Sequence, residues 1–342
     1  MSQRLRPFTL LAWLAGAGLL AWLLVQSDAV GILQAVAALG WWLVAVLVFH
    51  AAPLLLDVLG WRLLFAKMFP PVWRLFWIRW IGEGANGLLP VPQIGEFLRA
   101  KLARDHGSAG AEAAASVIAD ITMALATQLL FTLIGLGLFS LSSGSGAVWR
   151  ALAASLLLAA FAGVFYALQR YGVIGRAAAF LARRIGKSEH MFDLAGARRL
   201  DEMLKRVYSR PRLLAWSFAW RFAGWIVGTG EIVLILHALG HDVSFSAAIQ
   251  MESLSQAARV AAFLIPGGLG VQDGALLLVA GGLGITPGVA LTLSVARRFR
   301  ELALGLPALA AGYALEARGW ASARAKKSED SPQRHRDTEK KN

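Results

Sequence analysis

The sequence predicts an all-α integral membrane protein with about six transmembrane helices and two re-entrant hairpins broken by proline and glycine, arranged as an inverted internal repeat. Three observations predict this fold: the composition, the apolar stretches of helical length, and two stretches interrupted near their middle. Apolar residues make up 57% of the 342 residues and charged residues 16%, with a mean hydropathy of +0.57. Such a chain cannot disperse in water as a single globule, so the bilayer is its solvent.

Six stretches have the length and composition of membrane spans. A spanning helix needs about 20 predominantly apolar residues. The candidates are residues 8–25, 39–56, 113–140, 149–169, 213–239 and 289–314. Arginines precede the first stretch, as in a signal peptide, but its only Ala-x-Ala pattern lies in the middle of the run. We therefore expect this segment to be retained.

The net charge of +13 is explained by topology rather than by a nucleic-acid partner. Connectors 26–38, 140–147 and 240–250 contain no arginine or lysine, whereas the other connectors and both termini are basic. The positive-inside rule then places both termini in the cytoplasm of a bacterial inner (plasma) membrane, with Arg150 as the one exception. The chain has no cysteine, so it has no disulfide framework and no thiolate metal site.

The chain divides into four parts. Residues 1–169 form a first membrane half with three spans and a hairpin near 82–104, and residues 213–317 hold the remaining spans and a second hairpin near 252–283. Between them, residues 170–212 carry eleven arginines or lysines against four acids, which indicates a basic cytoplasmic linker. Its first part, 172–186, suits an interfacial amphipathic helix, or else a simple solvated linker. Residues 318–342 are expected to be a disordered cytoplasmic tail.

The two interrupted stretches follow one pattern. Each places a charged residue seven positions before a proline, then a glycine, then a carboxylate. These residues are Glu83, Pro90, Gly95 and Glu96 in the first stretch, and Arg259, Pro266, Gly270 and Asp273 in the second. Irregular backbone survives at membrane depth only when it is buried in protein or lines a watery cavity. Paired interruptions of this kind point to a transporter's central site, with two ordinary Pro-kinked helices as the alternative.

Charged residues inside the apolar stretches are expected to face the protein interior, because each costs a few kcal/mol against lipid. Arg297 and Glu301 are four residues apart in the last span and are predicted to pair. Arg221 lies near a span end and is expected to snorkel to the interface, and His50 to be structural. The predicted substrate path consists of Glu83, Pro90, Gly95, Glu96, Arg99, Asp120, Arg259, Pro266, Gly267, Gly268, Gly270, Asp273, Arg297, Arg298 and Glu301. The alternative is that these charges only neutralise one another and fix helix register.

The sequence contains no nucleophile, base and orienter in an arrangement that suits catalysis, so no enzyme activity is expected. The run Gly186-Lys187-Ser188 imitates the end of a P-loop, but Leu181 stands where the first glycine is needed. His237 and His241 have the spacing of a helical metal pair, but Gly240 is expected to end that helix. We therefore expect no metal and no cofactor.

The second interrupted stretch, Ile265-Pro-Gly-Gly-Leu-Gly-Val-Gln-Asp-Gly-Ala-Leu, is followed about twenty residues later by Ser294-Val-Ala-Arg-Arg. With the Leu-Pro and Gly-Glu-x-x-Arg of residues 89–99, it resembles the lysylphosphatidylglycerol synthase transmembrane family, whose members are flippase-like, over roughly residues 10–315. The stand-alone form, with Ser116-Val-Ile-Ala-Asp120, looks most like a branch associated with hopanoid biosynthesis. Only a short polar tail follows the membrane part, where the lysyl-lipid synthases carry an aminoacyl-transferase domain.

The resemblance implies translocation of an amphipathic lipid, anionic or of the isoprenoid or hopanoid type. Arginines would receive the head group, and Glu96 or Asp273 would carry a proton. Membrane lipids are then the expected partners, together with a second copy of the chain or lipid-biosynthesis proteins. The alternatives are a membrane-embedded accessory subunit or enzyme of lipid (hopanoid) biosynthesis, and a scaffold without cargo.

Overall fold

The structure, a computed structural model, describes residues 29–67, 69–89, 93–143, 194–262, 265 and 268–339. These residues form helices and connecting turns without any β-strand, which confirms the all-α class. The helices are α2 (Ala29–Ala38), α3 (Trp41–Phe49), α4 (Ala51–Arg62), α5 (Val72–Leu88), α6 (Ile94–Asp105), α7 (Gly110–Ser143), α10 (Leu194–Tyr208), α11 (Pro211–Ala238), α12 (Phe245–Ala261), α13 (Val271–Gly282) and α14 (Pro287–Glu339). The predicted spans 8–25 and 149–169, and the interfacial helix predicted at 172–186, lie outside the described residues.

Three helical stretches of the described chain are long and apolar enough to cross a membrane. They are Trp41–Arg62, which joins α3 and α4, Gly110–Leu141 in α7, and Pro211–Ala238, which is α11. They match three of the predicted spans. The predicted span 289–314 forms the first part of α14, where four charged side chains interrupt the apolar run.

Proline and glycine set the helix boundaries. Pro53 has no N–H to donate to the carbonyl of Phe49, and α3 gives way to α4 at this point. Pro211 and Pro287 are the first residues of α11 and α14, positions where the missing N–H costs nothing. Gly240, with φ 76°, follows α11 and ends it as expected.

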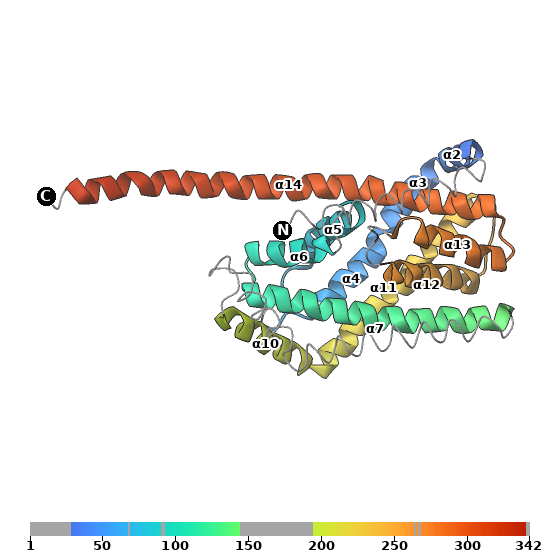
Figure 1. Ribbon diagram of the computed structural model, residues 1–342, viewed down its shortest axis with the longest axis horizontal. Helices are drawn as coiled ribbons and strands as arrows, with labels where there is room; N and C mark the ends of the chain where they lie inside the picture. Colours follow the sequence, from blue (N-terminus) through green and yellow to red (C-terminus); the bar gives the residue numbers. More distant parts are fainter. Residues whose placement is uncertain are drawn as a thin grey trace.

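The helices form two units that pack in corresponding ways. Helices α4, α5, α6 and α7 of the first unit correspond to α11, α12, α13 and α14 of the second. Helix α4 packs on α11, α5 packs on α14 and α12 packs on α7, so each hairpin lies against the long helix of the other unit. Helices α7 and α14 run in opposite directions, and the two hairpins lie between them, one toward each end (Figure 1). This arrangement is the inverted repeat that the sequence predicts.

The predicted connectors with and without arginine or lysine lie toward opposite ends of the molecule. Helix α2, the end of α7 and the start of α12 belong to the connectors without arginine or lysine, and they lie at the same end of the molecule (Figure 1). Helix α10 lies toward the other end and packs on α7, with Met203, Leu204 and Val207 in the core. The last part of the predicted linker is therefore a docked amphipathic helix.

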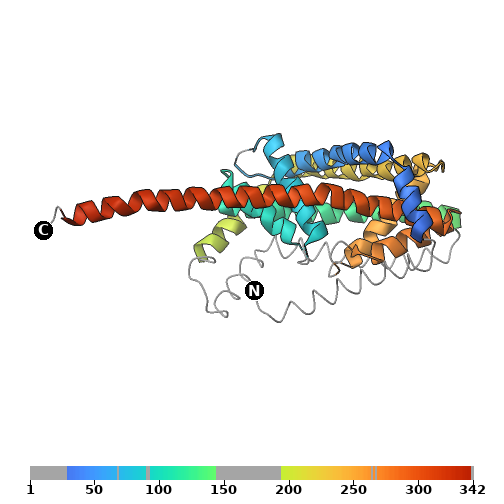
Figure 2. The same ribbon diagram turned by 90° about the horizontal axis from the view of Figure 1, so that it is seen from above.

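The structure differs from the prediction at the C-terminus. Helix α14 continues to Glu339 and projects beyond the helical body (Figures 1 and 2), where the sequence predicts a disordered tail from residue 318. Alanine, lysine, arginine and glutamate are strong helix formers and are frequent in this segment. Extending an existing helix also avoids the cost of nucleation.

Candidate functional site

The first hairpin is closed by polar contacts between its arms. The N–H of Gly95 donates to Oδ1 of Asn86 over 2.7 Å, and Nδ2 of Asn86 donates to Oε1 of Glu96 over 3.2 Å. Gln93, with φ 59°, turns the chain into α6. These contacts hold the predicted residues Gly95 and Glu96 against α5.

The second hairpin depends on two glycines with positive φ. Gly268 has φ 61°, and a Cβ added there would lie 2.7 Å from Cγ of Arg259. Gly270 has φ 74°, and its N–H donates to Oδ2 of Asp273 over 2.8 Å. Gly268 therefore allows a close approach of the turn to α12, and Gly270 allows the turn that brings its N–H to Asp273. Pro90, Pro266 and Gly267 lie outside the described residues.

A first cluster of buried charges surrounds Asp120 of α7. It consists of Asp57, Arg79, Glu96, Arg99, Asp120 and Arg221. Asp120 accepts hydrogen bonds from Arg99 over 2.6 Å and from Arg79 and Arg221 over 2.8 Å each. The guanidinium of Arg99 also lies 4.2 Å from the ring centroid of Trp61 and donates to Glu96 over 2.5 Å. The cluster joins five helices, α4, α5, α6 and α7 of the first unit and α11 of the second.

Arg221 corrects one sequence prediction. It was expected to snorkel toward the membrane interface, but it is buried and donates to Asp120. Its position near a span end gives no indication of this contact, because the partner carboxylate lies 101 residues away in the chain.

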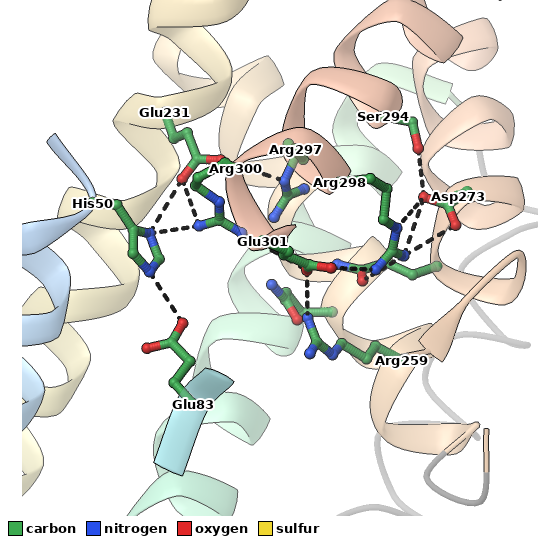
Figure 3. A network of polar contacts seen from close by, with 12 residues as sticks. His50, Glu83, Glu231, Arg259, Asp273, Ser294, Arg297, Arg298, Arg300 and Glu301 are labelled. Atoms are coloured by element: carbon green, nitrogen blue, oxygen red, sulfur yellow. Dashed lines mark hydrogen bonds and ion pairs between the residues drawn. The ribbon is translucent and has the colours of Figure 1, made fainter. Parts of the chain in front are cut away.

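A second cluster of charges joins the second hairpin to α14. It consists of His50, Glu83, Glu231, Glu252, Arg259, Asp273, Arg297, Arg298, Arg300 and Glu301. Arg298 lies between Asp273, at 3.0 Å, and Glu301, at 2.7 Å. Ser294 donates a short hydrogen bond to Asp273, and Arg259 of α12 donates to Glu301 over 3.3 Å. The contacts form a continuous network (Figure 3).

The other end of the second cluster reaches the first hairpin. Arg300 donates to Glu231 of α11 over 2.9 Å and contacts Nδ1 of His50 over 2.5 Å. On the opposite side of the ring, Nε2 of His50 lies 3.0 Å from Oε1 of Glu83 in α5. As Figure 3 shows, the imidazole stands between Glu83 and the pair of Glu231 and Arg300. Side chains from both hairpins are thus linked through α14.

The structure also corrects the predicted pairing of Arg297 with Glu301. Arg297 lies 2.9 Å from Glu252 of α12 and 3.8 Å from Glu231, whereas Glu301 pairs with Arg298 and Arg259. Residues four apart share a helix face, but both side chains reach partners on other helices instead.

A small pocket opens beside Arg298. Its cavity volume is about 10 Å³, which is room for about one water molecule and far less than the roughly 300–1,000 Å³ of most ligand sites. Its lining consists of Gln272, Asp273, Leu276, Ser294, Arg297, Arg298 and Glu301. The pocket has no room for a lipid head group in this conformation, so binding one there would require the hairpin to move.

The predicted path residues therefore divide between two sites. Glu96, Arg99 and Asp120 belong to the first cluster, and the second holds Glu83, Arg259, Asp273, Arg297, Arg298 and Glu301. The members of the two clusters that were not among the predicted path residues are His50, Asp57, Arg79, Arg221, Glu231, Glu252 and Arg300. A charge inside an apolar stretch marks Asp57 and Glu231, but the lone His50 carries no such signal. Among the described residues, no group of three or more potential metal ligands comes together, and His237 contacts Asp242.

The family described as "Lysylphosphatidylglycerol synthase TM region" matches residues 9–308. No curated protein and no solved structure matches the chain. The family match covers most of the sequence, including both hairpins and both charge clusters.

Proposed function

The chain belongs to the lysylphosphatidylglycerol synthase TM-region family, and from this premise we propose that it translocates an amphipathic lipid across a bacterial inner membrane. The observation that carries the proposal is the second cluster, a network of charges that links both hairpins of the inverted repeat. An apolar protein of this length could span the bilayer without such groups. Each of them costs a few kcal/mol at membrane depth.

The pairing in this cluster suits a moving part better than a static one. Most of its contacts cross between helices, although Glu301 also contacts Arg298 and Arg300 of its own helix. Glu231 and Glu301 each face more than one arginine. Rocking of one repeat against the other can exchange these partners without leaving a charge unpaired. Alternating access in transporters built from inverted repeats is motion of this kind.

The arginines of the cluster define the type of head group. A guanidinium presents a planar fork of donors that matches a phosphate or carboxylate, so Arg298 can exchange Asp273 for an anionic group of the cargo. Movement of the second hairpin would have to widen the small pocket beside Arg298 to admit the head group, while the apolar tail stays in the bilayer. An anionic phospholipid, an isoprenoid phosphate or a hopanoid derivative has this amphipathic form, and the motif resemblance favours the hopanoid type.

The test is a sided assay in proteoliposomes with NBD-labelled phosphatidylglycerol, phosphatidylethanolamine and a hopanoid analogue. Access of each label to external dithionite is followed over time. The expected result is acceleration by the wild-type chain and at least a tenfold loss, on the order of 1.4 kcal/mol, with Arg298→Lys, which keeps the charge but loses the fork. Arg104→Lys, an exposed arginine paired only with its neighbour Asp105, is the matched control.

Arg298→Ala is a harsher variant than the sequence suggests. It leaves Asp273 and Glu301 without their shared cation, so a folding defect has to be measured alongside transport. Acceleration that survives in a folded Arg298→Ala chain removes this residue from the mechanism. No acceleration with any of the three lipids, with or without a proton gradient, rejects translocation and favours an accessory role in lipid biosynthesis.

A further inference from the structure

The second cluster differs from the first in its balance of charge. The first cluster has three arginines and three carboxylates, Asp57, Glu96 and Asp120. The second has four arginines and five carboxylates, and its remaining member is His50. With a neutral imidazole the second cluster carries one excess negative charge, and with an imidazolium it is balanced. A proton on His50 therefore decides the net charge of the cluster.

The ring nitrogen Nδ1 of His50 stands between a donor and an acceptor. Arg300 contacts Nδ1 over 2.5 Å, and because a guanidinium only donates, Nδ1 accepts and the ring proton lies on Nε2, facing Glu83. Oε2 of Glu231 lies 3.5 Å from the same Nδ1. A proton added to Nδ1 would turn this atom into a donor, and Glu231 is positioned to accept from it.

Protonation of Nδ1 would displace Arg300, and the structure provides a second partner for it. Nη2 of Arg300 lies 3.8 Å from Oε1 of Glu301, the carboxylate that also holds Arg298 and Arg259. Nε of Arg300 is buried without a hydrogen bond among the described residues. A shift of Arg300 toward Glu301 would loosen the contacts of Glu301 with the second hairpin.

The ring is also accessible to protons. The side chain of Glu83 is 48% exposed and that of His50 is 15% exposed, whereas that of Glu231 is 5% exposed. The charged groups that face the ring are Glu83 from α5, Glu231 from α11 and Arg300 from α14. Exposure decreases from Glu83 through the imidazole to Glu231, so the least enclosed approach to the ring is from the side of Glu83.

From these contacts we infer that His50 is a proton-binding site whose occupancy controls the hold of Arg300 and Glu301 on the second hairpin, and that a proton is the coupling ion of transport. The inference rests on the proposed function for its second part only. Glu96 and Asp273, which sequence reasoning assigned to proton transfer, are already engaged by Arg99 and Arg298, so a proton there would have to displace a guanidinium.

Proton binding is tested without any transport assay. The full chain carries ¹⁵N-histidine in nanodiscs, and the ring nitrogens are followed by NMR from about pH 5 to pH 9, the range in which histidine changes charge in proteins. The His50 signal is assigned as the one that is absent from the spectrum of His50→Gln. As the pH falls, the chemical shift of its Nδ1 should change from that of an acceptor to that of an N–H, and Glu83→Gln should alter this titration curve. The exposed pair of His237 and Asp242 is the control, because Asp242→Asn should leave the His50 curve unchanged. A His50 signal that is constant over this range overturns the inference.

Coupling is tested by the lipid ratio between leaflets under a gradient of about one pH unit with the membrane potential clamped. If one proton moves with each lipid, the ratio of labelled lipid between the two leaflets should reach up to about ten. This ratio should fall to about one in His50→Gln and stay at the wild-type value in His237→Gln. Translocation without asymmetry leaves the proposed function standing and rejects the proton as coupling ion. A titrating His50 in a chain that moves no lipid rejects the proposed function and keeps the proton site.

Discussion

Replacement of Asp120 by asparagine is expected to lower the stability of the folded protein strongly. The change keeps the shape of the side chain and removes one charge at the point where three arginines meet. Arg79 keeps Asp57 at 2.6 Å and Arg99 keeps Glu96 at 2.5 Å, but the next carboxylate from Arg221 lies 3.9 Å away. The cluster would then have three buried guanidinium groups and two carboxylates.

The expected loss follows from the partners that remain. Removing one member of a buried ion pair costs about 3–5 kcal/mol, because the other charge stays buried. Two of the three arginines keep a close carboxylate in Asp120→Asn, so the loss in free energy of unfolding should come mainly from Arg221. We therefore expect the loss of one ion pair rather than of three. Asp120 itself is 1% exposed, and little water can compensate for the missing charge.

The assay is equilibrium unfolding of the purified chain in mixed micelles, followed by tryptophan fluorescence as the fraction of denaturing detergent rises. Asp105→Asn is the matched control, since Asp105 pairs with Arg104 on the surface and its loss should cost about 0–1 kcal/mol. A loss below about 1 kcal/mol for Asp120→Asn would refute the view that the first cluster stabilises the fold through this carboxylate.

Three further substitutions test the packing. Gly84→Ala should cost about 1–3 kcal/mol in the same unfolding assay, because its Cβ would lie 2.8 Å from Cβ of Ala308 on α14, whereas Gly137→Ala, with open space, should cost nothing; equal effects would contradict the close approach of α5 to α14. Ser244→Ala should cost about 1 kcal/mol, since its side chain caps α12 by accepting from the N–H of Ala247, and an unchanged midpoint would exclude this cap. Trp61→Leu should cost about 2–4 kcal/mol through lost volume, the cation–π contact with Arg99 and the hydrogen bond to Ser116, and retained stability would show that Arg99 needs no ring.

Much of the fold could be predicted from the sequence because its signals are local. Apolar runs of helical length identify the spans, and proline with glycine identifies the two hairpins, whose arms are α5 with α6 and α12 with α13. The acids that follow the turns, Glu96 and Asp273, lie in the first turn of the returning helix as their spacing implies. The connectors without arginine or lysine lie together at one end of the molecule.

The site could be predicted only in part, because its contacts are long-range. His50 contacts Arg300, which lies 250 positions further along the chain. No pattern in the apolar stretch around His50 predicts this contact. A lone histidine on such a helix is indistinguishable from a structural one until the other helices are placed. For the same reason the partner of Arg221 could not be inferred from its position near a span end.

The wrong pairing of Arg297 with Glu301 shows the limit of helical spacing. Spacing defines which residues share a face, but long side chains on a buried helix also reach neighbouring helices. Arg297 contacts Glu252 of α12, and Glu301 instead takes Arg298, three residues before it. In a membrane interior the unpaired acids of other helices compete more strongly than on an exposed helix, because they too need a partner.

The two clusters use corresponding helices with the signs of charge exchanged. In the first unit an acid on the long helix α7, Asp120, receives arginines from α5, α6 and α11. In the second unit the arginines lie on the long helix α14 and reach acids on α11, α12 and α13. A head group of the proposed cargo would therefore meet different charges in the two units. The feature that the two units share is an ionic link between a long helix and a hairpin.

Helix α11 takes part in both links. It contributes Arg221 to the first cluster and Glu231 to the second, ten residues and about 15 Å apart along its axis. A shift of α11 would thus act on both clusters at once, with opposite charges at its two contacts. Of the two clusters, only the second contains a histidine, His50, the residue type most often used as a proton switch. Protonation there would alter the contacts of Glu231 with His50 and Arg300, and a resulting shift of α11 would also act on Arg221 in the first cluster.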